Sequence, residues 1–519
     1  MRWTSVLALL GMSALTLAQD GTFTNPVLWE DLADIDVIRV NDTFYYSAST
    51  MHYSPGAPVL RSYNLADWEY IGHSVPTLDW ASDYSLENGK RAYVRGIWAS
   101  TIQYRPSTQT FFWLGCIDSS TTYIYTADTA EGPWKKSGTI PTCYYDAGLL
   151  VDTDDTMYVA YDKYNISVAQ LSEDGLSQVK SEVVYRAPAD IGYLEGARFY
   201  NINGNHYIWL TRPASDQFVL KSISGPFGPY ELREVVIGVD APVAGGGSPH
   251  QGALVDTPSG DWYYMAFIDA YPGGRIPVLA PVEWDEDGWP SVTLDNGAWG
   301  SSYPLPFVST DKTITPIPTS YTFEESTLSA EWEWNHNPDN EKWSLSGGLI
   351  LKTATMTDDL YSARNTLTRR IPGPKSSATI HLDISKMSDG DRAGLSLFRD
   401  TSAWIGIRRD EGGSRVSMTS GLSMDSNWNT KSKGSEEAGA GFSGEGIWLR
   451  ATIDITPGTE RKGSFAYSTD GSSFTELGGE LTLNSDWPFF LGYRYGIFNY
   501  ATEELGGQVT VKKFELGSE

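Results

Sequence analysis

The sequence predicts an all-β protein, a five-bladed β-propeller followed by a β-sandwich (jelly-roll) domain. One short unit occurs five times in the first 270 residues: a leading residue, a run of β-type residues, a turn, and a second run rich in aromatics. Successive leading residues lie 48 to 64 positions apart. A repeat of about 50 residues with paired strands and polar turns is typical of propeller blades. The leading residues are Asp34, Trp98, Asp146, Glu195 and His250.

Each repeat predicts a pair of antiparallel strands, because alternating β-branched and aromatic residues are interrupted by turn sequences such as NG, DD and SGD. The expected strand pairs, in chain order, are 34–40 with 43–50, 98–104 with 110–116, 146–151 with 156–162, 195–202 with 205–212, and 250–255 with 262–267. The innermost strand of each blade lines the central axis, so residues at equivalent positions of the repeat converge on one pocket. No convincing amphipathic helix interrupts the pattern.

A composition shift divides the chain, whose 519 residues are too many for one ordinary core. We expect the propeller over residues 22–308 and a polar linker rich in Pro and Thr over residues 309–320. Residues 321–519 contain strand signals about 8–15 residues apart with Gly, Asp and Ser turns, and this spacing predicts the two-sheet sandwich.

Residues 1–18 predict a secretory signal peptide, since Arg2 precedes an apolar stretch and Thr16-Leu17-Ala18 fits a small-residue cleavage site. The sequons at Asn41 and Asn165 agree with a secreted, extracellular glycoprotein. No later segment approaches the 18 apolar residues of a membrane span, so we expect no membrane association.

The formal charge of −27 would repel nucleic acid and anionic membranes. A neutral polymer is indifferent to this charge, and an aromatic content of 13% suits a sugar-binding cleft. Cys116 and Cys143 are the only cysteines, which excludes a disulfide scaffold and a cysteine-built zinc site. They lie on neighbouring expected blades, and either one bridge or two buried thiols is compatible with that placement.

Three carboxylates among the leading residues indicate glycosidic-bond hydrolysis. That reaction needs a protonated carboxyl as general acid and an ionised carboxylate to activate water or attack the sugar. A third acidic group raises the pKa of the acid, because like charges disfavour ionisation. Asp34, Asp146 and Glu195 are the candidates. Asp36 is the alternative to Asp34, since both point to the same side of a strand, but the distance of Asp34 from the turn matches the other leading residues.

Four further residues are candidates for the same pocket. Trp98 and Tyr145 are candidate apolar platforms for a sugar ring, and Arg275, after two glycines, can reach into the pocket from the fifth repeat. The alternatives are ordinary packing for the aromatics and a solvated turn for the arginine. His250 is a candidate metal ligand, and a satisfied core histidine is the alternative.

The segments around these residues resemble glycoside hydrolase family 43, in particular its fungal arabinoxylan α-L-arabinofuranosidases that act on doubly substituted xylose. The propeller segments that carry the resemblance are TNPVLWEDLADIDVIRV, GIWASTIQY, CYYDAGLLVDTDDTMYVAY, LEGARFYNINGNHYIWLTRPA, PHQGALVDTPSGDWYYMAF and GGRIPVLAPVEWDEDGWP. In the C-terminal stretch AEWEWNHNPDNEKWSL, DLYSARNTLTRRIPGPK, DGDRAG and GYRYGIFNY carry it.

The resemblance implies a five-bladed propeller and hydrolysis with inversion, and it assigns roles. Asp34 would be the general base, Asp146 the residue that modulates a pKa, and Glu195 the general acid. The family's usual Pro-Asp-Pro is Ala33-Asp34-Ile35 here, so the carboxylate is kept without its flanking prolines. Arg275 falls on the family's active-site arginine. His250 falls on its axial histidine, which implies a structural calcium ion and no cofactor for the chemistry.

The expected function is release of α-L-arabinofuranosyl side chains from arabinoxylan or its oligosaccharides by a monomeric enzyme, with O-3-linked arabinose on doubly substituted xylose as the target. The alternatives are an exo-acting β-xylosidase and a non-catalytic carbohydrate-binding propeller. The sandwich either binds xylan itself or packs on the propeller and completes the cleft, and the second role is favoured because the linker is short. The sandwich aromatics Trp332, Trp334, Trp343, Tyr495 and Phe498 fit both roles.

Overall fold

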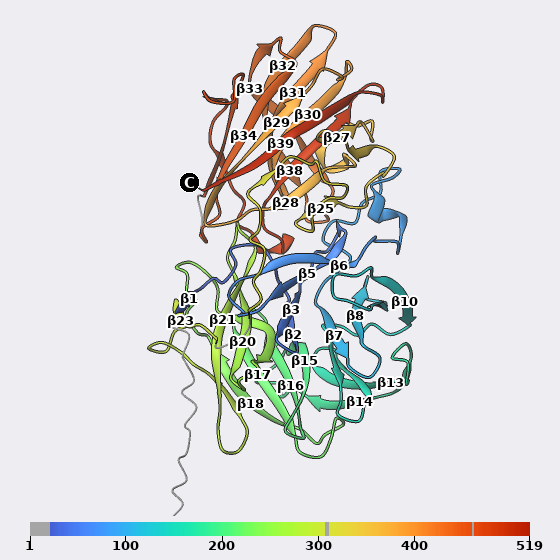
Figure 1. Ribbon diagram of the computed structural model, residues 1–519, viewed down its shortest axis with the longest axis vertical. Coiled ribbons are helices and arrows are strands. Elements are labelled where there is room, and N and C mark those ends of the chain that lie inside the picture. Colours follow the sequence, from blue (N-terminus) through green and yellow to red (C-terminus); the bar gives the residue numbers. More distant parts are fainter. Residues whose placement is uncertain (1–20, 307–310, 459–460, 519) are drawn as a thin grey trace, which may run out of the picture.

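The computed structural model describes residues 21–306, 311–458 and 461–518. These residues form a five-bladed β-propeller and a β-sandwich stacked along the long axis of the molecule, which confirms the predicted fold class (Figure 1). The expected signal peptide, and residues 307–310 at the expected boundary between propeller and linker, lie outside the described residues. No helix in the described part of the chain is long and apolar enough to cross a membrane.

Each blade is a four-stranded antiparallel sheet, and in each case the innermost strand begins at, or two residues after, a leading residue of the repeat. The strands of the five blades, in chain order, are β2 (Asp36–Val40), β3 (Thr43–Ser47), β5 (Gly56–Ser62) and β6 (Glu69–Val75); β7 (Ser100–Arg105), β8 (Thr110–Ile117), β9 (Thr121–Ala127) and β10 (Lys135–Ile140); β11 (Gly148–Val151), β12 (Met157–Tyr161), β13 (Asn165–Leu171) and β14 (Gln178–Arg186); β15 (Glu195–Ile202), β16 (Asn205–Arg212), β17 (Asp216–Ser222) and β18 (Glu231–Ile237); and β19 (His250–Asp256), β20 (Trp262–Asp269), β21 (Arg275–Trp284) and β22 (Pro290–Val292).

The ends of the propeller are tied together by a separate two-stranded sheet. In it β1 (Thr22–Thr24) pairs with β23 (Ser302–Pro304), so the first and last parts of the domain are hydrogen-bonded to each other. The Asn25 carboxamide donates to the carbonyls of Leu279 and Gly300, both at 2.9 Å. A short 3-10 helix, η1 (Ser82–Ser85), lies between the first two blades. A disulfide joins Cys116 to Cys143, which settles the open choice between a bridge and free thiols.

The sandwich consists of an eight-stranded and a nine-stranded sheet with a shared aliphatic and aromatic core. The larger sheet contains β24 (Ser320–Tyr321), β26 (Trp343–Leu345), β27 (Leu349–Lys352), β29 (Lys375–Asp383), β34 (Gly446–Asp454), β35 (Lys462–Ser468), β36 (Thr475–Glu476), β37 (Leu481–Thr482) and β39 (Gln508–Ser518). The smaller sheet contains β25 (Trp332–Asn335), β28 (Leu367–Arg370), β30 (Asp391–Phe398), β31 (Thr401–Asp410), β32 (Gly413–Met424), β33 (Thr430–Phe442), β38 (Arg494–Ala501) and, from the propeller, β4 (Tyr53–Ser54). Two 3-10 helices, η2 (Leu360–Ser362) and η3 (Trp487–Phe489), complete the domain.

The two domains are joined by backbone pairing as well as by side chains. Strand β4 leaves the first blade and pairs with β25 of the sandwich, so the smaller sandwich sheet is completed by the propeller. A buried ionic network lies beside this pairing. Glu333 is fully buried and bonds to Arg370 at 2.9 Å, Arg494 at 2.6 Å and His73 of the propeller at 3.1 Å. The domains therefore form one body in which the sandwich can shape the catalytic face.

We expect Glu333→Ala to lower the free energy of unfolding by about 3–5 kcal/mol, because it leaves two buried guanidinium groups without their carboxylate. The arginines hold the pKa of Glu333 below its ordinary value, so this contribution is fully present at neutral pH and is lost progressively as the pH falls from the ordinary pKa through the lowered one. Denaturant unfolding at pH 7 measures the loss. Glu182→Gln, which removes an exposed ion pair with Lys180, is the matched control and should cost no more than about 1 kcal/mol. An equal, small loss in both variants would contradict a stabilising network.

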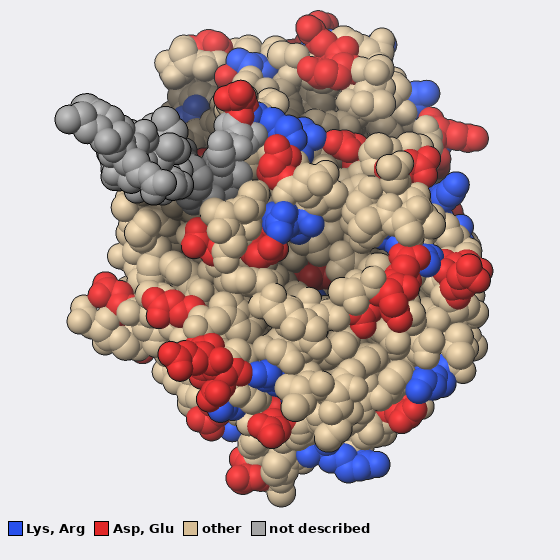
Figure 2. All heavy atoms as spheres, turned by 60° about the horizontal axis from the view of Figure 1, so that its bottom comes forward, with Lys and Arg blue, Asp and Glu red and all other residues tan. Residues whose placement is uncertain are grey.

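Charged side chains are scattered over the propeller surface that Figure 2 brings forward. Lys and Arg lie singly among Asp and Glu, and the face is hollowed near its centre. This view shows no basic patch that could bind a phosphate backbone, in agreement with the net charge of −27.

Candidate active site

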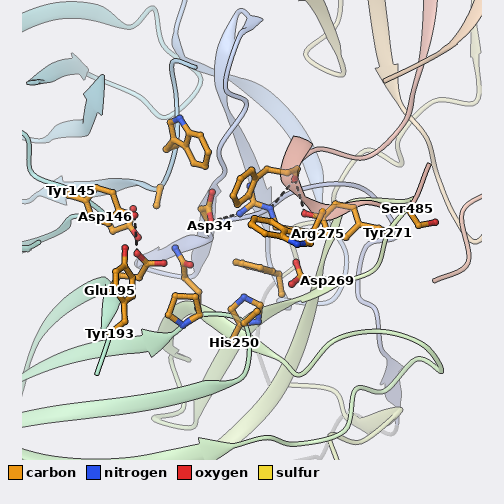
Figure 3. Close-up of a pocket in the computed structure, with 18 residues that line it drawn as sticks. Asp34, Tyr145, Asp146, Tyr193, Glu195, His250, Asp269, Tyr271, Arg275 and Ser485 are labelled. Carbon is orange, nitrogen blue, oxygen red and sulfur yellow. Dashed lines mark hydrogen bonds and ion pairs between the residues drawn. The ribbon is translucent and has the colours of Figure 1, made fainter. Parts of the chain in front are cut away.

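The inner ends of the blades surround a cavity of about 740 Å³, and the sandwich closes one side of it. All seven site residues expected from the sequence line this cavity. Its lining residues are Asp34, Trp98, Ala99, Tyr145, Asp146, Tyr193, Glu195, Pro213, Ala214, His250, Gln251, Phe267, Asp269, Tyr271, Arg275, Ser485, Trp487 and Phe490. In Figure 3 Asp34 lies between the Glu195 and Asp146 carboxyls on one side and Arg275 on the other.

Asp34 lies just before the innermost strand β2 and is almost fully buried. Its backbone has a φ of 56°, in the left-handed region that non-glycine residues rarely adopt, and Asp146 shares this conformation with a φ of 49°. Such strained residues concentrate at functional sites. Arg275 Nη1 donates to Asp34 Oδ1 at 2.8 Å, while the buried Oδ2 has no hydrogen-bond partner among the described residues. One oxygen is thus fixed by the arginine and the other is left for a group bound in the cavity.

Asp36, the alternative to Asp34, is hydrogen-bonded within the protein and has a structural role. Its Oδ2 accepts from the Thr101 hydroxyl at 2.7 Å and from the Ile102 amide at 2.9 Å. Its Oδ1 lies 3.4 Å from Nε of the buried Arg198. These bonds tie the first blade to the second, and Asp36 is not among the residues that line the cavity. The arrangement favours Asp34 as the reacting carboxylate.

Glu195 opens β15 and is followed by Gly196, whose φ of 69° lies in the left-handed region that favours glycine. A Cβ there would lie 3.0 Å from side-chain atoms of Gln251 and Thr211, so a larger residue would be strained. The Tyr145 hydroxyl donates to Glu195 Oε2 at 2.9 Å. Burial raises the pKa of Glu195, and the nearby charge of Asp34 raises it further. Hydrogen bonds from Tyr145 and Tyr193, together with the Lys163 ammonium, lower this pKa in part. The net raised pKa suits a carboxyl that must hold a proton near neutral pH.

Asp146 precedes β11 and is buried beside the other two carboxyls. Burial raises its pKa well above the ordinary value, and the charges of Glu195 and Asp34 add to the effect. Because burial raises the pKa of both Asp146 and Glu195, and an ionised Glu195 raises that of Asp146 further, a proton is retained among these carboxyls at a pH where an exposed carboxyl has lost it. This is the electrostatic arrangement in which one carboxyl keeps its neighbour protonated.

Replacing Tyr145 by Phe should move the alkaline limb of the pH–activity profile to higher pH. The Tyr145 hydroxyl bonds to the ionised form of Glu195 and lowers its pKa, so its removal raises that pKa. Because a general acid is active only when protonated, activity then persists to higher pH. Profiles of kcat/KM against pH measure the shift. Tyr164→Phe is the control, since Tyr164 is exposed and does not line the cavity; a limb that stays in place in Tyr145→Phe would contradict the role.

Arg275 connects Asp34 to the sandwich. Its Nε donates to the carbonyl of Phe490 at 3.1 Å, and its backbone amide donates to Asp31 Oδ1 at 2.8 Å. Asp31 Oδ2 accepts from the Gly492 amide of the sandwich at 2.9 Å. The alternative of a solvated turn arginine is therefore excluded, because Arg275 is buried and held from both domains.

Aromatic side chains form the wall where the domains meet. Trp98 is half-buried and packs edge-on against Phe490 of the sandwich, with ring centroids 4.9 Å apart. Trp487 of η3 packs against Phe490 in the same way at 5.4 Å, yet it is 61% exposed at the mouth of the cavity. Exposed aromatic faces of this kind are suited to stacking on sugar rings. The sandwich thus supplies part of the cleft. This agrees with the expectation that it packs on the propeller and completes the cleft.

His250 is buried, with its ring 4.5 Å from that of Phe267, and its Nδ1 lies 2.9 Å from the Ser248 carbonyl. Burial lowers its pKa, so the ring is neutral. Calcium takes six to eight oxygen ligands, whereas His250 offers one ring nitrogen. The described residues contain no group of three or more His, Cys, Asp or Glu side chains placed to hold a metal. This donor set does not fit a protein-built calcium cage.

Several lining residues were not singled out from the sequence. Tyr193 lies two positions before Glu195, a spacing that places both on one side of an extended chain, and Gln251 directly follows His250. Phe267 and Asp269 pair across the blade with His250 and Arg275, so the register of β19, β20 and β21 determines their position. Trp487 begins η3 and Phe490 directly follows it, more than 200 residues after Arg275, and no local sequence pattern links this segment to the propeller.

Comparisons with known proteins agree with this geometry. Residues 23–290 match the model of glycosyl hydrolases family 43, and residues 320–516 match that of the beta xylosidase C-terminal concanavalin A-like domain. A solved structure with a TM-score of 0.93 is 47% identical and covers 96% of this chain and 100% of its own; it is described as an engineered GH43 glycoside hydrolase with both endo-xylanase and exo-arabinofuranosidase activity.

Curated relatives are more distant. A beta-xylosidase of Formosa agariphila is 27% identical over 95% of this chain and 90% of that protein. A non-reducing end alpha-L-arabinofuranosidase of Bacteroides ovatus is 26% identical over 80% of each chain. The fungal source and the preference for doubly substituted xylose that the sequence resemblance suggests are properties that these matches do not address. The family match over the propeller, together with the three converging carboxyls, places this chain in glycoside hydrolase family 43.

Proposed function

We propose that the protein is an exo-acting α-L-arabinofuranosidase that removes O-3-linked arabinose from doubly substituted xylose in arabinoxylan. The observation that carries the proposal is a second hollow of about 520 Å³ beside the catalytic cavity. The two hollows share Trp98, Ala99, Tyr145 and Asp146. An enzyme that removes side chains needs such an open cleft for the main chain beside its pocket, whereas an exo-xylosidase needs a closed end.

The proposed chemistry is a single displacement at the anomeric carbon. Asp34 Oδ2 takes a proton from a water molecule as the water attacks, while Arg275 holds Oδ1 and keeps the carboxylate oriented. Glu195, whose pKa is raised by burial and by the charge of Asp34, protonates the oxygen of the departing xylose. Asp146 is the third carboxyl of the cavity and takes the place of the residue that modulates a pKa. Inversion needs room for the water between the two carboxyls, so their separation in the substrate complex should be about 6.5–9.5 Å.

The comparisons support both family activities. The relative with 47% identity is described by an exo-arabinofuranosidase activity, and the Bacteroides ovatus protein is named for the same activity. The Formosa agariphila and Xylanibacter ruminicola relatives are named as a beta-xylosidase and a putative beta-xylosidase. β-Xylosidase is therefore the second candidate, because arabinofuranose and xylopyranose offer similar ring substituents to one pocket.

Secretion is part of the proposal. The Cys116–Cys143 disulfide is typical of proteins in oxidising compartments. The sequon residues Asn41 and Asn165 are both exposed in the described structure, as a glycosylated asparagine must be. The proposal therefore places the enzyme outside the cell, where polymeric arabinoxylan is accessible.

Product analysis on defined oligosaccharides tests the proposal. Xylo-oligosaccharides that carry one or two arabinose units on a single xylose, together with linear xylo-oligosaccharides, are incubated with the full-length protein, and the released sugars are separated by chromatography. We expect arabinose from the doubly substituted compound. Release of xylose from the linear compound alone would move the function to β-xylosidase, and the absence of any released sugar would favour a binding propeller.

A further inference from the structure

A second cleft lies at the junction of the two domains and shares no residue with the catalytic cavity. It has a volume of about 450 Å³ and runs between β6 of the first blade and β25 and β26 of the sandwich. Strands β6 and β25 lie at the waist of the molecule, where the two domains meet (Figure 1). We call it the junction groove. Its lining residues are Ser54, Pro55, Ile71, Gly72, His73, Pro76, Thr77, Leu328, Ser329, Ala330, Trp332, Trp334, Asn337, Pro338, Asn340 and Trp343.

The lining is neutral in a strongly charged protein. The chain has 38 Lys and Arg and 65 Asp and Glu, yet none of these lines the junction groove. The one titratable lining side chain, His73, lies 3.1 Å from Glu333, which the arginines of the buried network already neutralise. The lining offers no charge that could pair with a charged peptide or a nucleic acid. A neutral ligand needs no such pairing, so it suits this groove.

Aromatic rings in the junction groove are held in fixed orientations. Trp343 is half-buried, its ring centroid lies 5.1 Å from that of Trp334, and its Nε1 donates to Asn340 Oδ1 at 2.9 Å. Trp334 is almost fully buried and supports the outer ring from below. A rigid, partly exposed indole with an adjacent carboxamide provides the stacking surface and the hydrogen-bonding groups that sugar recognition uses.

Trp332 adds an unsatisfied donor. Its side chain is 2% exposed, and its indole N–H has no hydrogen-bond partner among the described residues. Trp332, Leu328 and Ser329 also line an adjoining hollow of about 170 Å³, whose lining includes Glu325, so this indole marks the end of the neutral groove. A buried donor without a partner costs free energy, and a ligand hydroxyl that accepts its hydrogen would recover that cost.

From the neutral lining, the fixed indoles and the unpaired donor, we propose that the junction groove binds the main chain of xylan, a neutral chain of β-linked xylose, at a site separate from the catalytic pocket. The choice of xylan rests on the proposed function, which makes this polymer the substrate. The site would hold the polymer on the enzyme while the catalytic pocket removes one sugar at a time. Its effect should therefore be large on polymers and absent on short substrates.

Native affinity electrophoresis of the full-length protein in gels that contain linear xylan tests the groove. Linear xylan also fits the open cleft beside the catalytic pocket, so the part of the retardation that the groove variants lose reports the junction groove. We expect Trp343→Ala to weaken the apparent affinity at least fivefold. Ser329→Arg fills the groove without removing any packing and should do the same. Trp448→Ala, which removes a half-buried tryptophan stacked on His381 elsewhere in the sandwich, should bind as the unmodified protein does.

All three variants should keep the unmodified kcat/KM on whichever aryl arabinofuranoside or aryl xyloside the enzyme hydrolyses. Unchanged xylan binding in both Trp343→Ala and Ser329→Arg, or no binding by the unmodified protein, would overturn the proposal. Equal retardation by cellulose-type or arabinan gels would overturn the assignment to xylan. The gel assay measures xylan binding and does not depend on release of arabinose. The loss of binding in the groove variants can therefore be measured even if the protein proves not to be an arabinofuranosidase.

Discussion

Asp34→Ala should lower kcat by about 10²–10⁴-fold on every substrate, natural or activated. Without the carboxylate no group is left to accept the proton of the attacking water, and this step is needed whatever the leaving group. Arg275 Nη1 also loses its partner at 2.8 Å, so the guanidinium remains buried with one charge unpaired. Steady-state kinetics on arabinoxylan oligosaccharides and on an aryl glycoside measure the effect.

Asp36→Asn is the matched control for Asp34. Asp36 is equally buried but bonds to Thr101 and Ile102 outside the cavity, so its replacement should lower the thermal unfolding temperature and leave most of the turnover. Near-normal turnover in Asp34→Ala, or a larger kinetic loss in Asp36→Asn, would reverse the assignment of the two aspartates.

Glu195→Ala should lower kcat by an amount that depends on the leaving group of the substrate. On arabinoxylan, where the departing xylose oxygen needs a proton, kcat should fall by about 10²–10⁴-fold. On an aryl glycoside with an acidic phenol as leaving group, the fall should be small, because such a phenolate departs without a proton. The alkaline limb of the pH profile should also disappear, since the raised pKa of Glu195 sets that limb.

The comparison of the two substrates separates the roles of the carboxyls. Equal losses on both substrates in Glu195→Ala would mean that Glu195 acts as a base or a structural group instead of an acid. Circular dichroism of the variant, compared with that of Tyr164→Phe, shows whether the fold is intact.

Much of the propeller could be predicted from the sequence because each blade repeats one local unit. The strand pairs around Asp34, Trp98, Asp146, Glu195 and His250 lie where the alternation of apolar residues and the turn sequences place them. Symmetry then brings the leading residues to one axis, so the carboxyls, which come from three different blades, could be named together.

Contacts between the domains could not be predicted in this way. Strand β4 is two residues long and lies between two strands of the first blade, but its partner is β25, about 280 residues later. Phe490 accepts the hydrogen bond from Arg275 through its backbone carbonyl. Every residue has such a carbonyl, so the identity of residue 490 does not predict this contact. The sequence already favoured Asp34 over Asp36 by its distance from the turn, but the bond from Thr101 that gives Asp36 a structural role is a contact between blades that the sequence does not show.

Time-resolved proton NMR during hydrolysis tests the central claim most directly, namely that Asp34 and Glu195 act in a single inverting displacement. The first sugar signal from doubly substituted arabinoxylan should be the β-anomer of free arabinose, before mutarotation equilibrates the anomers. If the α-anomer appears first, the reaction retains configuration, a carboxylate attacks the sugar itself, and Asp34 is not the base that activates water.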